Sequence, residues 1–525
     1  MIDEATLPPA APDPNQTHVY AIHGVDPEVL AYAMAKYSRS ALTLKQSLRE
    51  ISAQRAEQFL NTFYFQYGHR SIADLAHIPF AIERLSLLAA IALVDEQRWD
   101  GQERSTRYQD FRKSGWYTPQ LDGQTGTQTE AYTAAIKALF AAYDQFSTGM
   151  LTALKAAIPC PEEMKPDAYE RTLKARAFDV ARYLLPLSTN TSLGQIVNAR
   201  TLETQVSRLL TSEFAEIRTL GEKLRNAASE PAWNVQHESI RHFVLDLDDP
   251  TAREANDLLL RPVKTAPTLV KYAVANDYQR ESRFVLAQAA EELMKAACIH
   301  PAPVVDLIEG NEPLEIELAT SLLYPHCHYP YRQLRDHVAA LNPARIAEII
   351  HLGTQNRGRH DELLRAFHVG AALKFDILMD IGGFRDMHRH RRCTQLLQGF
   401  TDLHGFDTPD APGQPTLAAS GLQEGYANAM ESAYKAYRTL RDSGIPEAAQ
   451  SAQYLLPLGT RCRSMFKMDF AEAVYISELR SGVAGHYSYR RVAWEMYETV
   501  KRQHPAMAGM FRIEDVNEPV DLLRR

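Results

Sequence analysis

The sequence contains one short segment twice, as Ala181-Arg-Tyr-Leu-Leu-Pro-Leu187 and as Ala452-Gln-Tyr-Leu-Leu-Pro-Leu458. About one helix beyond each copy lie two arginines that are ten residues apart: Arg208 and Arg218, and Arg480 and Arg490. Landmarks that recur in the same order indicate an internal duplication. We therefore expect two related halves that meet near residues 300–303.

The polar motifs are divided between the halves. Only the first half contains Gln102-Glu103-Arg104-Ser105-Thr106-Arg107-Tyr108, and only the second contains Arg389-His390-Arg391-Arg392. A duplication in which each copy keeps a different polar motif predicts one site that both halves build together.

Bulk properties narrow the class of protein. The chain has 525 residues, which is too long for one ordinary core and suits two domains of roughly 200–280 residues. It is 45% apolar and 23% charged, as soluble globular proteins are, and no apolar run approaches the roughly 20 residues that span a membrane. The net charge of -8 argues against a general nucleic-acid binder. Five cysteines without CxxC spacing predict a reduced, cytoplasmic protein with no cysteine-based metal site.

Most of the chain has the apolar spacing of helices. We expect long helices within 28–60, 129–157, 194–228, 268–297 and 424–442. Two short segments, 77–83 and 373–378, alternate as strands do, and each runs into a helical segment. The pattern predicts a helix-rich α+β fold with a disordered leader over 1–17 and two domains over 18–300 and 303–525, each with a small sheet flanked by long helices.

The motif of the first half can hold an anion. Glu103, Ser105 and Arg107 alternate, so an extended backbone would place them on one side, where hydroxyl and guanidinium groups can bind a phosphate. The alternative is a solvated polar loop. The arginines further on, Arg182, Arg200 and Arg208, can equally form ion pairs with Glu203, Glu213 or Glu216.

The motif of the second half concentrates positive charge in an acidic protein. Arg385 and Arg389 are four residues apart and share a helix face, and His388, His390, Arg391 and Arg392 lie beside them. This favours an anionic ligand such as phosphate, pyrophosphate or a reduced-flavin anion. The alternative is that these cations complement the dipole at a helix C-terminus. Cys393 is either a thiol with a depressed pKa or a buried, inert one.

Taken together and in this order, the motifs resemble flavin-dependent thymidylate synthase, and in particular the long, tandem-duplicated members of that family. The family signature is one continuous run: Arg-His-Arg, a serine, and then Asn/Gln-Glu-x-Ser-x-Arg-Tyr. Here 102–108 matches its end and 389–391 its beginning. The missing parts fall on Asp95-Glu96-Gln97 in the first half and on Leu397, Gly399, Thr401 and Asp402 in the second.

The resemblance implies two tandem thymidylate synthase-like domains with one composite site per chain, in a homodimer that imitates the tetramer of the family. It implies FAD as cofactor, NADPH and methylenetetrahydrofolate as co-substrates, and conversion of dUMP to dTMP, without nucleic-acid or membrane partners. The implied catalytic residues are Arg389, Ser105 and Arg107. Nucleotide binding is implied for Glu103, Ser105, Arg107, Arg182, Asp386, Arg389 and Arg480. Flavin binding is implied for Ser38, His69, Ser71, Asp74, Asn198, Arg200, Arg389, His390 and Arg391.

Asp386 departs from the family, since it falls where a glutamine usually contacts the uracil. It leaves two further hypotheses open. One is flavin- and folate-dependent modification of a different pyrimidine nucleotide, and the other is a non-catalytic flavin- or nucleotide-binding or scaffold protein.

Overall fold

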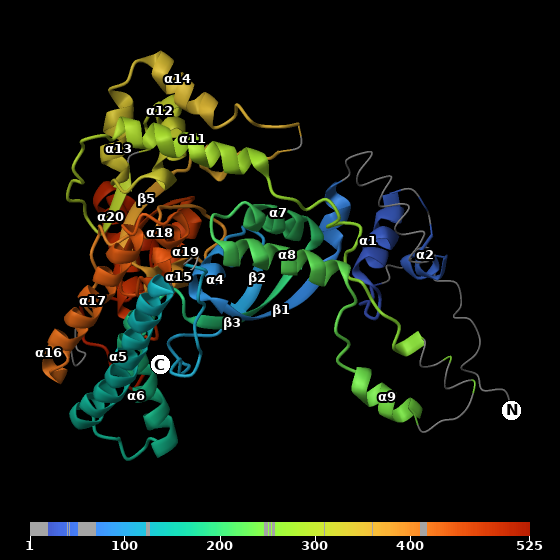
Figure 1. The fold of residues 1–525 in the computed structure, drawn as a ribbon, viewed down its shortest axis with the longest axis horizontal. Helices are drawn as coiled ribbons and strands as arrows, with labels where there is room; N and C mark the ends of the chain where they lie inside the picture. The colour runs from blue at the N-terminus through green and yellow to red at the C-terminus, as the bar shows by residue number, and fades with distance from the viewer. Residues whose placement is uncertain are drawn as a thin grey trace. The chain divides into compact units, whose positions relative to one another are not determined.

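The computed structural model describes residues 19–38, 40, 42–50, 70–121, 126–245, 250, 254, 258–308, 310–359, 361–409 and 417–524. These residues divide into two compact units (Figure 1). Unit 1 draws on 1–78, 198–200 and 226–272, and unit 2 on 79–197, 201–225 and 273–525. The expected leader and the expected helix beyond residue 50 lie outside the described residues. No described helix is long and apolar enough to span a membrane.

The elements are mostly helices of different lengths, with a few strands between them. Up to residue 245 they are α1 (Pro27–Ala35), η2 (Lys36–Ser38), α2 (Leu44–Glu50), η4 (Arg70–Leu75), β1 (His77–Ser86), α4 (Leu87–Val94), β2 (Asp100–Glu103), α5 (Thr127–Ala157), α6 (Pro166–Ala181), η5 (Arg182–Leu184), β3 (Asn190–Asn198), α7 (Ala199–Leu210), α8 (Ala215–Ser229) and α9 (His237–Leu245). From residue 277 they are α11 (Asp277–Leu293), β4 (Val305–Ile308), α12 (Leu314–Leu323), η6 (Tyr324–His326), α13 (Tyr331–Ala339), α14 (Pro343–Leu352), η7 (Arg365–Phe367), β5 (Leu373–Asp380), α15 (Ile381–Met387), β6 (Thr394–Leu397), α16 (Leu417–Ser420), α17 (Gln423–Arg441), α18 (Pro446–Ser451), η8 (Ala452–Leu455), β7 (Arg461–Met468), α19 (Phe470–Ser481), α20 (Tyr487–Gln503) and η9 (Pro505–Met510).

The helix-rich α+β class with small sheets is confirmed, and so are the strands expected at 77–83 and 373–378. Two expected helices are wrong at their starts. Residues 190–198 form β3, in which buried and more exposed residues alternate as they do in a half-covered sheet. α11 begins at Asp277 rather than near 268, because the Asn276 side chain caps it by accepting a hydrogen bond from the Gln279 amide.

The two sheets repeat one strand order. The first is β1-β3-β2, and the second is β4-β5-β7-β6, so β5-β7-β6 has the same order with β4 added at the edge. The helices that follow β1 and β5, α4 and α15, are fixed in the same way. The amide of Leu88 donates to the carbonyl of Leu187 at 3.0 Å, and that of Gly382 donates to Leu458 at 3.0 Å. The repeated segments thus occupy equivalent places.

The two copies of the repeated segment also bind each other. The Leu187 amide donates to the Leu456 carbonyl at 3.0 Å, and the Leu458 amide donates to the Leu185 carbonyl at 2.9 Å. All four leucine side chains are fully buried. Because each copy pairs through its backbone and fills the core with its side chains, an apolar residue suits most positions. At the second position the copies differ, with Arg182 in the first and Gln453 in the second.

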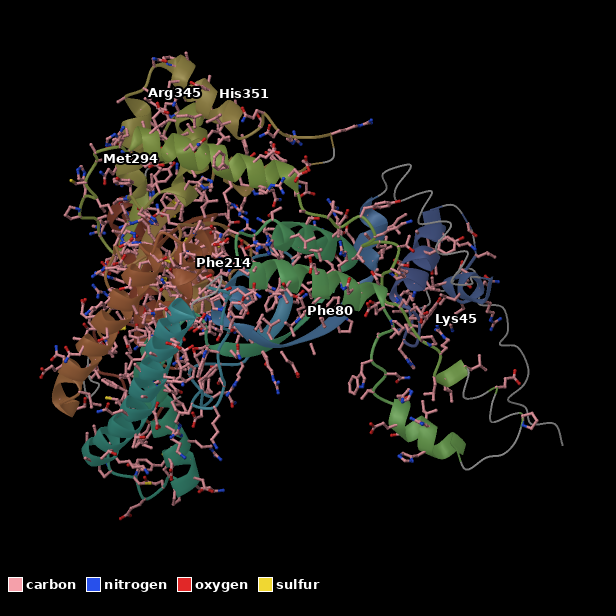
Figure 2. All side chains as sticks on the ribbon, in the orientation of Figure 1. Lys45, Phe80, Phe214, Met294, Arg345 and His351 are labelled. Atoms are coloured by element: carbon pink, nitrogen blue, oxygen red, sulfur yellow. The ribbon has the colours of Figure 1, made fainter. Side chains whose placement is uncertain are left out.

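Helices cover the second sheet and join the halves. α11, α12, α13 and α14 share a core with Ile308, Leu396 and Met465 of the second sheet, and Met294 belongs to it (Figure 2). Arg345 on α14 pairs with Glu292 on α11 at 2.8 Å. α17 packs against α5, which brings the Phe146 and Tyr426 rings to 6.3 Å. These contacts also hold the halves together, in addition to the paired segments.

Candidate functional site

Arg182 lies at the centre of a polar cluster that both halves build in unit 2. It begins η5, directly after α6, and its residue is 1% exposed. Its Nη1 lies 3.2 Å from Oδ2 of Asp386. Its Nε and Nη2 are buried and have no hydrogen-bond partner among the described residues. Buried guanidinium groups with unused donors are costly, so this side chain indicates a site for a hydrogen-bond acceptor.

Asp386 is an ionised carboxylate among arginines. Burial alone would raise the pKa of Asp386, but Arg182, Arg107, Arg389 and Arg480 together hold it at about 2. The first two of these arginines come from the first half and the last two from the second. The structure therefore brings together five of the seven residues predicted to bind the nucleotide.

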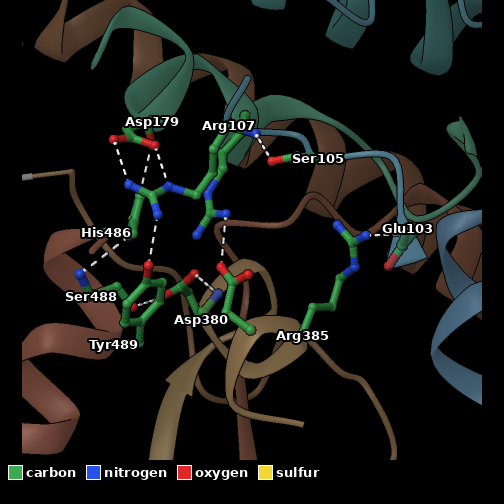
Figure 3. A network of polar contacts seen from close by, with 12 residues as sticks. Glu103, Ser105, Arg107, Asp179, Asp380, Arg385, His486, Ser488 and Tyr489 are labelled. Carbon is green, nitrogen blue, oxygen red and sulfur yellow. Dashed lines mark hydrogen bonds and ion pairs between the residues drawn. The ribbon is translucent and has the colours of Figure 1, made fainter. Parts of the chain in front are cut away.

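Arg107 is almost fully engaged with the protein itself (Figure 3). Its Nε and Nη2 donate to the carboxylate of Asp179 on α6 at 2.7 and 3.1 Å. Its Nη1 donates to the hydroxyl of Tyr489 on α20 at 2.6 Å, and Nη2 also donates to the carbonyl of Ala484 at 3.1 Å. The alternative of a solvated polar loop is therefore wrong at Arg107, which is buried and links the halves.

Glu103 and Ser105, the other two predicted residues of this motif, lie beside the cluster. Glu103 ends β2 and forms a buried ion pair with Arg385 on α15 (Figure 3). Ser105 accepts a hydrogen bond from the Arg107 amide at 3.2 Å, which fixes the turn that carries the guanidinium. Arg385 keeps a buried Nε without a partner among the described residues.

The Arg389-His390-Arg391 segment follows the C-terminus of α15. Arg389 is exposed, and within the described part of the chain it makes no hydrogen bond or ion pair. Nε2 of His390 accepts from Nε of Arg480 at 2.8 Å, and burial, with Arg480 and Arg391 nearby, lowers the pKa of His390 to about 3. Arg391 pairs with Asp100 at 3.1 Å and lies over the Trp99 ring. His390 is thus a neutral imidazole, and in the sequence it lies between the cations Arg389 and Arg391.

Cys393 is inert, as the second alternative held. It is 4% exposed, and burial raises the pKa of its thiol to about 12. A thiol with so high a pKa is not a nucleophile at neutral pH.

In the first half, acidic residues stand at the place of Arg-His-Arg, and they form ion pairs with arginines of the protein. Asp95 pairs with Arg365, and Nε of Arg208 donates to Glu96 at 2.9 Å. Arg208 thus binds Glu96 as Arg480 binds His390. The ion pairing expected for Arg208 is present, but its partner is Glu96 rather than Glu203, Glu213 or Glu216. Acidic residues therefore occupy the place that Arg389, His390 and Arg391 hold in the second half.

A family model described as "Thymidylate synthase complementing protein" matches residues 22–232 and 332–506. The chain belongs to this family. It is 26% identical to a UPF0159 protein of Chlamydia pneumoniae, across 96% of this chain and 93% of that protein. It is 32% identical to a flavin-dependent thymidylate synthase of Saccharolobus solfataricus, across 23% of this chain and 45% of that enzyme.

Solved structures also align with parts of the chain. One is flavin-dependent thymidylate synthase ThyX from Helicobacter pylori complexed with FAD and dUMP, at 16% identity and a TM-score of 0.26, covering 39% of this chain and 89% of that chain. Another is a UMP/dUMP methylase from Streptomyces cacaoi, at 18% identity and a TM-score of 0.28, covering 38% and 84%.

The remaining residues that the family resemblance assigns to the flavin belong to unit 1. Arg200, at the start of α7, pairs with Asp74 of η4 at 3.3 Å. Ser71 is exposed in η4, and Asn198 ends β3. His69 and the side chain of Ser38 lie outside the described residues. Arg389, His390 and Arg391 belong to unit 2.

Sequence reasoning missed the carboxylates that organise the cluster. Asp179 holds Arg107, and Asp380 caps α15 by accepting from the Gly383 amide at 2.6 Å and from the Ser488 hydroxyl. His486 caps α20: its Nδ1 accepts from the Ser488 amide at 3.2 Å, and its Nε2 lies 2.9 Å from the Asp179 carbonyl. An aspartate at the end of a strand that runs into a helix is a capping signal that points to Asp380.

The ionisation of Asp386 should make the free energy of unfolding depend on pH in acid. A carboxyl whose folded pKa is lowered contributes stability above its unfolded pKa of about 3.9, and this contribution disappears as the pH falls through about 2. Replacement by asparagine should therefore cost roughly 2 kcal/mol at pH 5 and progressively less between pH 4 and pH 2. Urea unfolding of wild type and Asp386→Asn across this range measures it. A difference that stays constant with pH would contradict a lowered pKa.

Proposed function

We propose that this protein is a flavin-dependent methyltransferase that converts dUMP to dTMP with methylenetetrahydrofolate, with NADPH as reductant and one composite site per chain. The observation that carries the proposal is the cluster around Asp386, where buried Arg182 has unused donors and arginines of both halves converge. We further propose a cytoplasmic homodimer that imitates the tetramer of the family.

The cluster suits the phosphate and base of a nucleotide. Arg389 and Arg182 would bind the phosphate and stabilise negative charge that develops on the pyrimidine ring, because Arg389 is unpaired among described residues and Arg182 has free donors. Ser105 would be a positioning donor, since no base lies beside it. Arg107, held by Asp179 and Tyr489, keeps one N–H of Nη1 for the nucleotide.

The residues present also fit FAD. Arg389 and the buried Nη1 of Arg391, which has no partner among the described residues, offer donors for a diphosphate. When bound, FAD would supply the electrons of the reductive methylation. The protein's part is to hold these donors in place: the Arg480 hydrogen bond fixes His390, and Asp100 with Trp99 fixes Arg391.

One observation favours a second candidate, modification of another pyrimidine nucleotide. Ionised Asp386 can only accept hydrogen bonds, whereas a glutamine at this place can both donate and accept. O4 of uracil is an acceptor, but the exocyclic amine of cytosine is a donor, so a carboxylate favours an amino-pyrimidine. The third candidate, a non-catalytic binding or scaffold protein, predicts a colourless protein that takes up no FAD.

Spectroscopy and isotope release test these candidates together. We expect the purified protein to show a flavin spectrum that dUMP perturbs, and to release tritium from C5-labelled dUMP when methylenetetrahydrofolate and NADPH are present. Release from C5-labelled dCMP alone would favour the second candidate, and Asp386→Gln should then shift the preference toward dUMP. A protein that binds neither FAD nor nucleotide would refute both enzymatic proposals.

A further inference from the structure

A large cavity lies in unit 2 apart from the cluster around Asp386. Its volume is about 810 Å³, within the range of roughly 300–1,000 Å³ that small-molecule sites occupy. Its walls come from the end of β5, the start of β7, the loop around Asp407, one side of α20 and residues near Val516. Arg107, Arg182, Asp386 and Arg389 are not among its lining residues. It is therefore a separate space from the proposed nucleotide site.

Three arginines line this cavity. Arg491 is exposed, and Nε of Arg461 lies 3.7 Å from Oδ1 of Asp407. Arg490 is 4% exposed; its Nε donates to the Ser481 carbonyl at 2.7 Å, while its buried Nη2 has no hydrogen-bond partner in the described ranges. A nearly buried guanidinium with an unused donor at the wall of a cavity points to an acceptor group on a ligand.

The acidic residues of the lining do not balance these arginines. They are Asp407 and Glu495. Burial and the nearby Asp380 carboxyl raise the pKa of Asp407 to about 7, although Arg461 and Arg491 oppose the shift. Even with Asp407 and Glu495 both ionised, the three arginines give the lining a net positive charge that attracts an anion.

The rest of the lining is apolar and partly aromatic. Trp494 and Phe406 are both half-buried, so a face or edge of each ring is accessible. Val304, Leu378, Met379, Val492, Val516 and Val520 complete the apolar wall. Aromatic and branched side chains favour a flat, apolar body, which a bare inorganic anion does not have.

We propose that this cavity binds a planar aromatic or heterocyclic small molecule that bears a carboxylate, sulfonate or phosphate group. Arg461, Arg490 and Arg491 receive the anionic group, and Trp494 and Phe406 contact the ring. The site is independent of the proposed function, but it shares an element with the nucleotide site. Ser488 lines the cavity and donates to Asp380, and the next residue, Tyr489, accepts from Arg107.

A fluorescence titration of the full chain with 1-anilinonaphthalene-8-sulfonate, an aromatic anion, tests the proposal. We expect saturable binding, weakened about tenfold by Arg461→Gln and by Arg491→Gln, as the loss of a charge-assisted hydrogen bond requires. Arg502→Gln is the matched control, because Arg502 is also an exposed arginine of α20 and does not line the cavity. Val520→Trp, which fills the cavity and keeps every charge, should abolish the binding.

Each other outcome overturns the proposal. Equal affinities in wild type, Arg461→Gln and Arg491→Gln would mean that the probe binds elsewhere. An equal loss in Arg502→Gln would mean that only overall charge matters. Displacement by dUMP, or a loss of affinity in Arg389→Gln, would place the probe in the nucleotide site. A cooperative thermal transition in each variant shows that it is folded, and if Arg461→Gln is not, the exposed position in Arg491→Gln carries the test alone.

Discussion

Arg107→Ala is expected to lower the free energy of unfolding by about 3–5 kcal/mol, as the loss of one partner of a buried ion pair does. Arg107 and Asp179 are 6% and 3% exposed, and their two hydrogen bonds measure 2.7 and 3.1 Å. Without Arg107, Nη1 of Arg176 still lies 4.0 Å from Oδ2 of Asp179, a weaker contact than the two hydrogen bonds that are lost. The variant also loses the hydrogen bond to Tyr489, which ties the first half to α20.

A neighbouring arginine provides the control for this prediction. Arg112 pairs with Asp110 and with Asp144, but its side chain is 45% exposed. Exposed ion pairs contribute only about 0–1 kcal/mol, so Arg112→Ala should leave stability nearly unchanged. Urea denaturation of both variants compares them directly. Arg107→Lys should also be destabilising, because an ammonium group cannot form the two parallel bonds to Asp179. If Arg107→Ala and Arg112→Ala prove equally stable, Arg107 does not link the halves energetically.

The sequence predicted that residues of both halves come together, because two parts of one motif are divided between the halves. The division of 102–108 and 389–391 between the halves predicted one site of mixed origin. In the structure, Arg107 and Arg182 of the first half and Arg389 and Arg480 of the second all act on the pKa of Asp386. Whether these residues bind nucleotide and flavin stays a prediction.

The partners of these arginines could not be predicted, because they are set by tertiary packing. Asp179 lies in α6, where nothing in its spacing distinguishes it from a solvated carboxylate. Tyr489 is 382 residues from Arg107 in sequence, and Glu96 is 112 residues from Arg208. The strand β3 was missed for a similar reason: its buried residues include the polar Thr191 and Gln195, and the apolar Ile196 is exposed, so the sequence does not alternate as the burial does.

Arg389→Ala should weaken nucleotide binding and leave stability unchanged, whereas Arg107→Ala should lower stability. Arg389 is exposed and, within the described residues, makes no hydrogen bond or ion pair, so its truncation should change the free energy of unfolding by no more than about 0.5 kcal/mol. The affinity for dUMP should nevertheless fall on the order of 100-fold, because a charged group that binds the ligand directly is lost. Calorimetric titration with dUMP, and the dUMP-induced change in the flavin spectrum, measure this loss.

Arg392→Ala is the matched control, since Arg392 is also exposed and lies three residues further along the same segment. It should bind dUMP as wild type does, because no role in the cluster is proposed for it. If Arg389→Ala and Arg392→Ala bind dUMP equally well, the exposed guanidinium of Arg389 is not part of a nucleotide site and the composite site is wrong. If both lose affinity to the same extent, the segment acts through its overall charge. A loss of affinity confined to Arg389→Ala would assign direct binding of dUMP to the exposed guanidinium of Arg389 rather than to the charge of the segment.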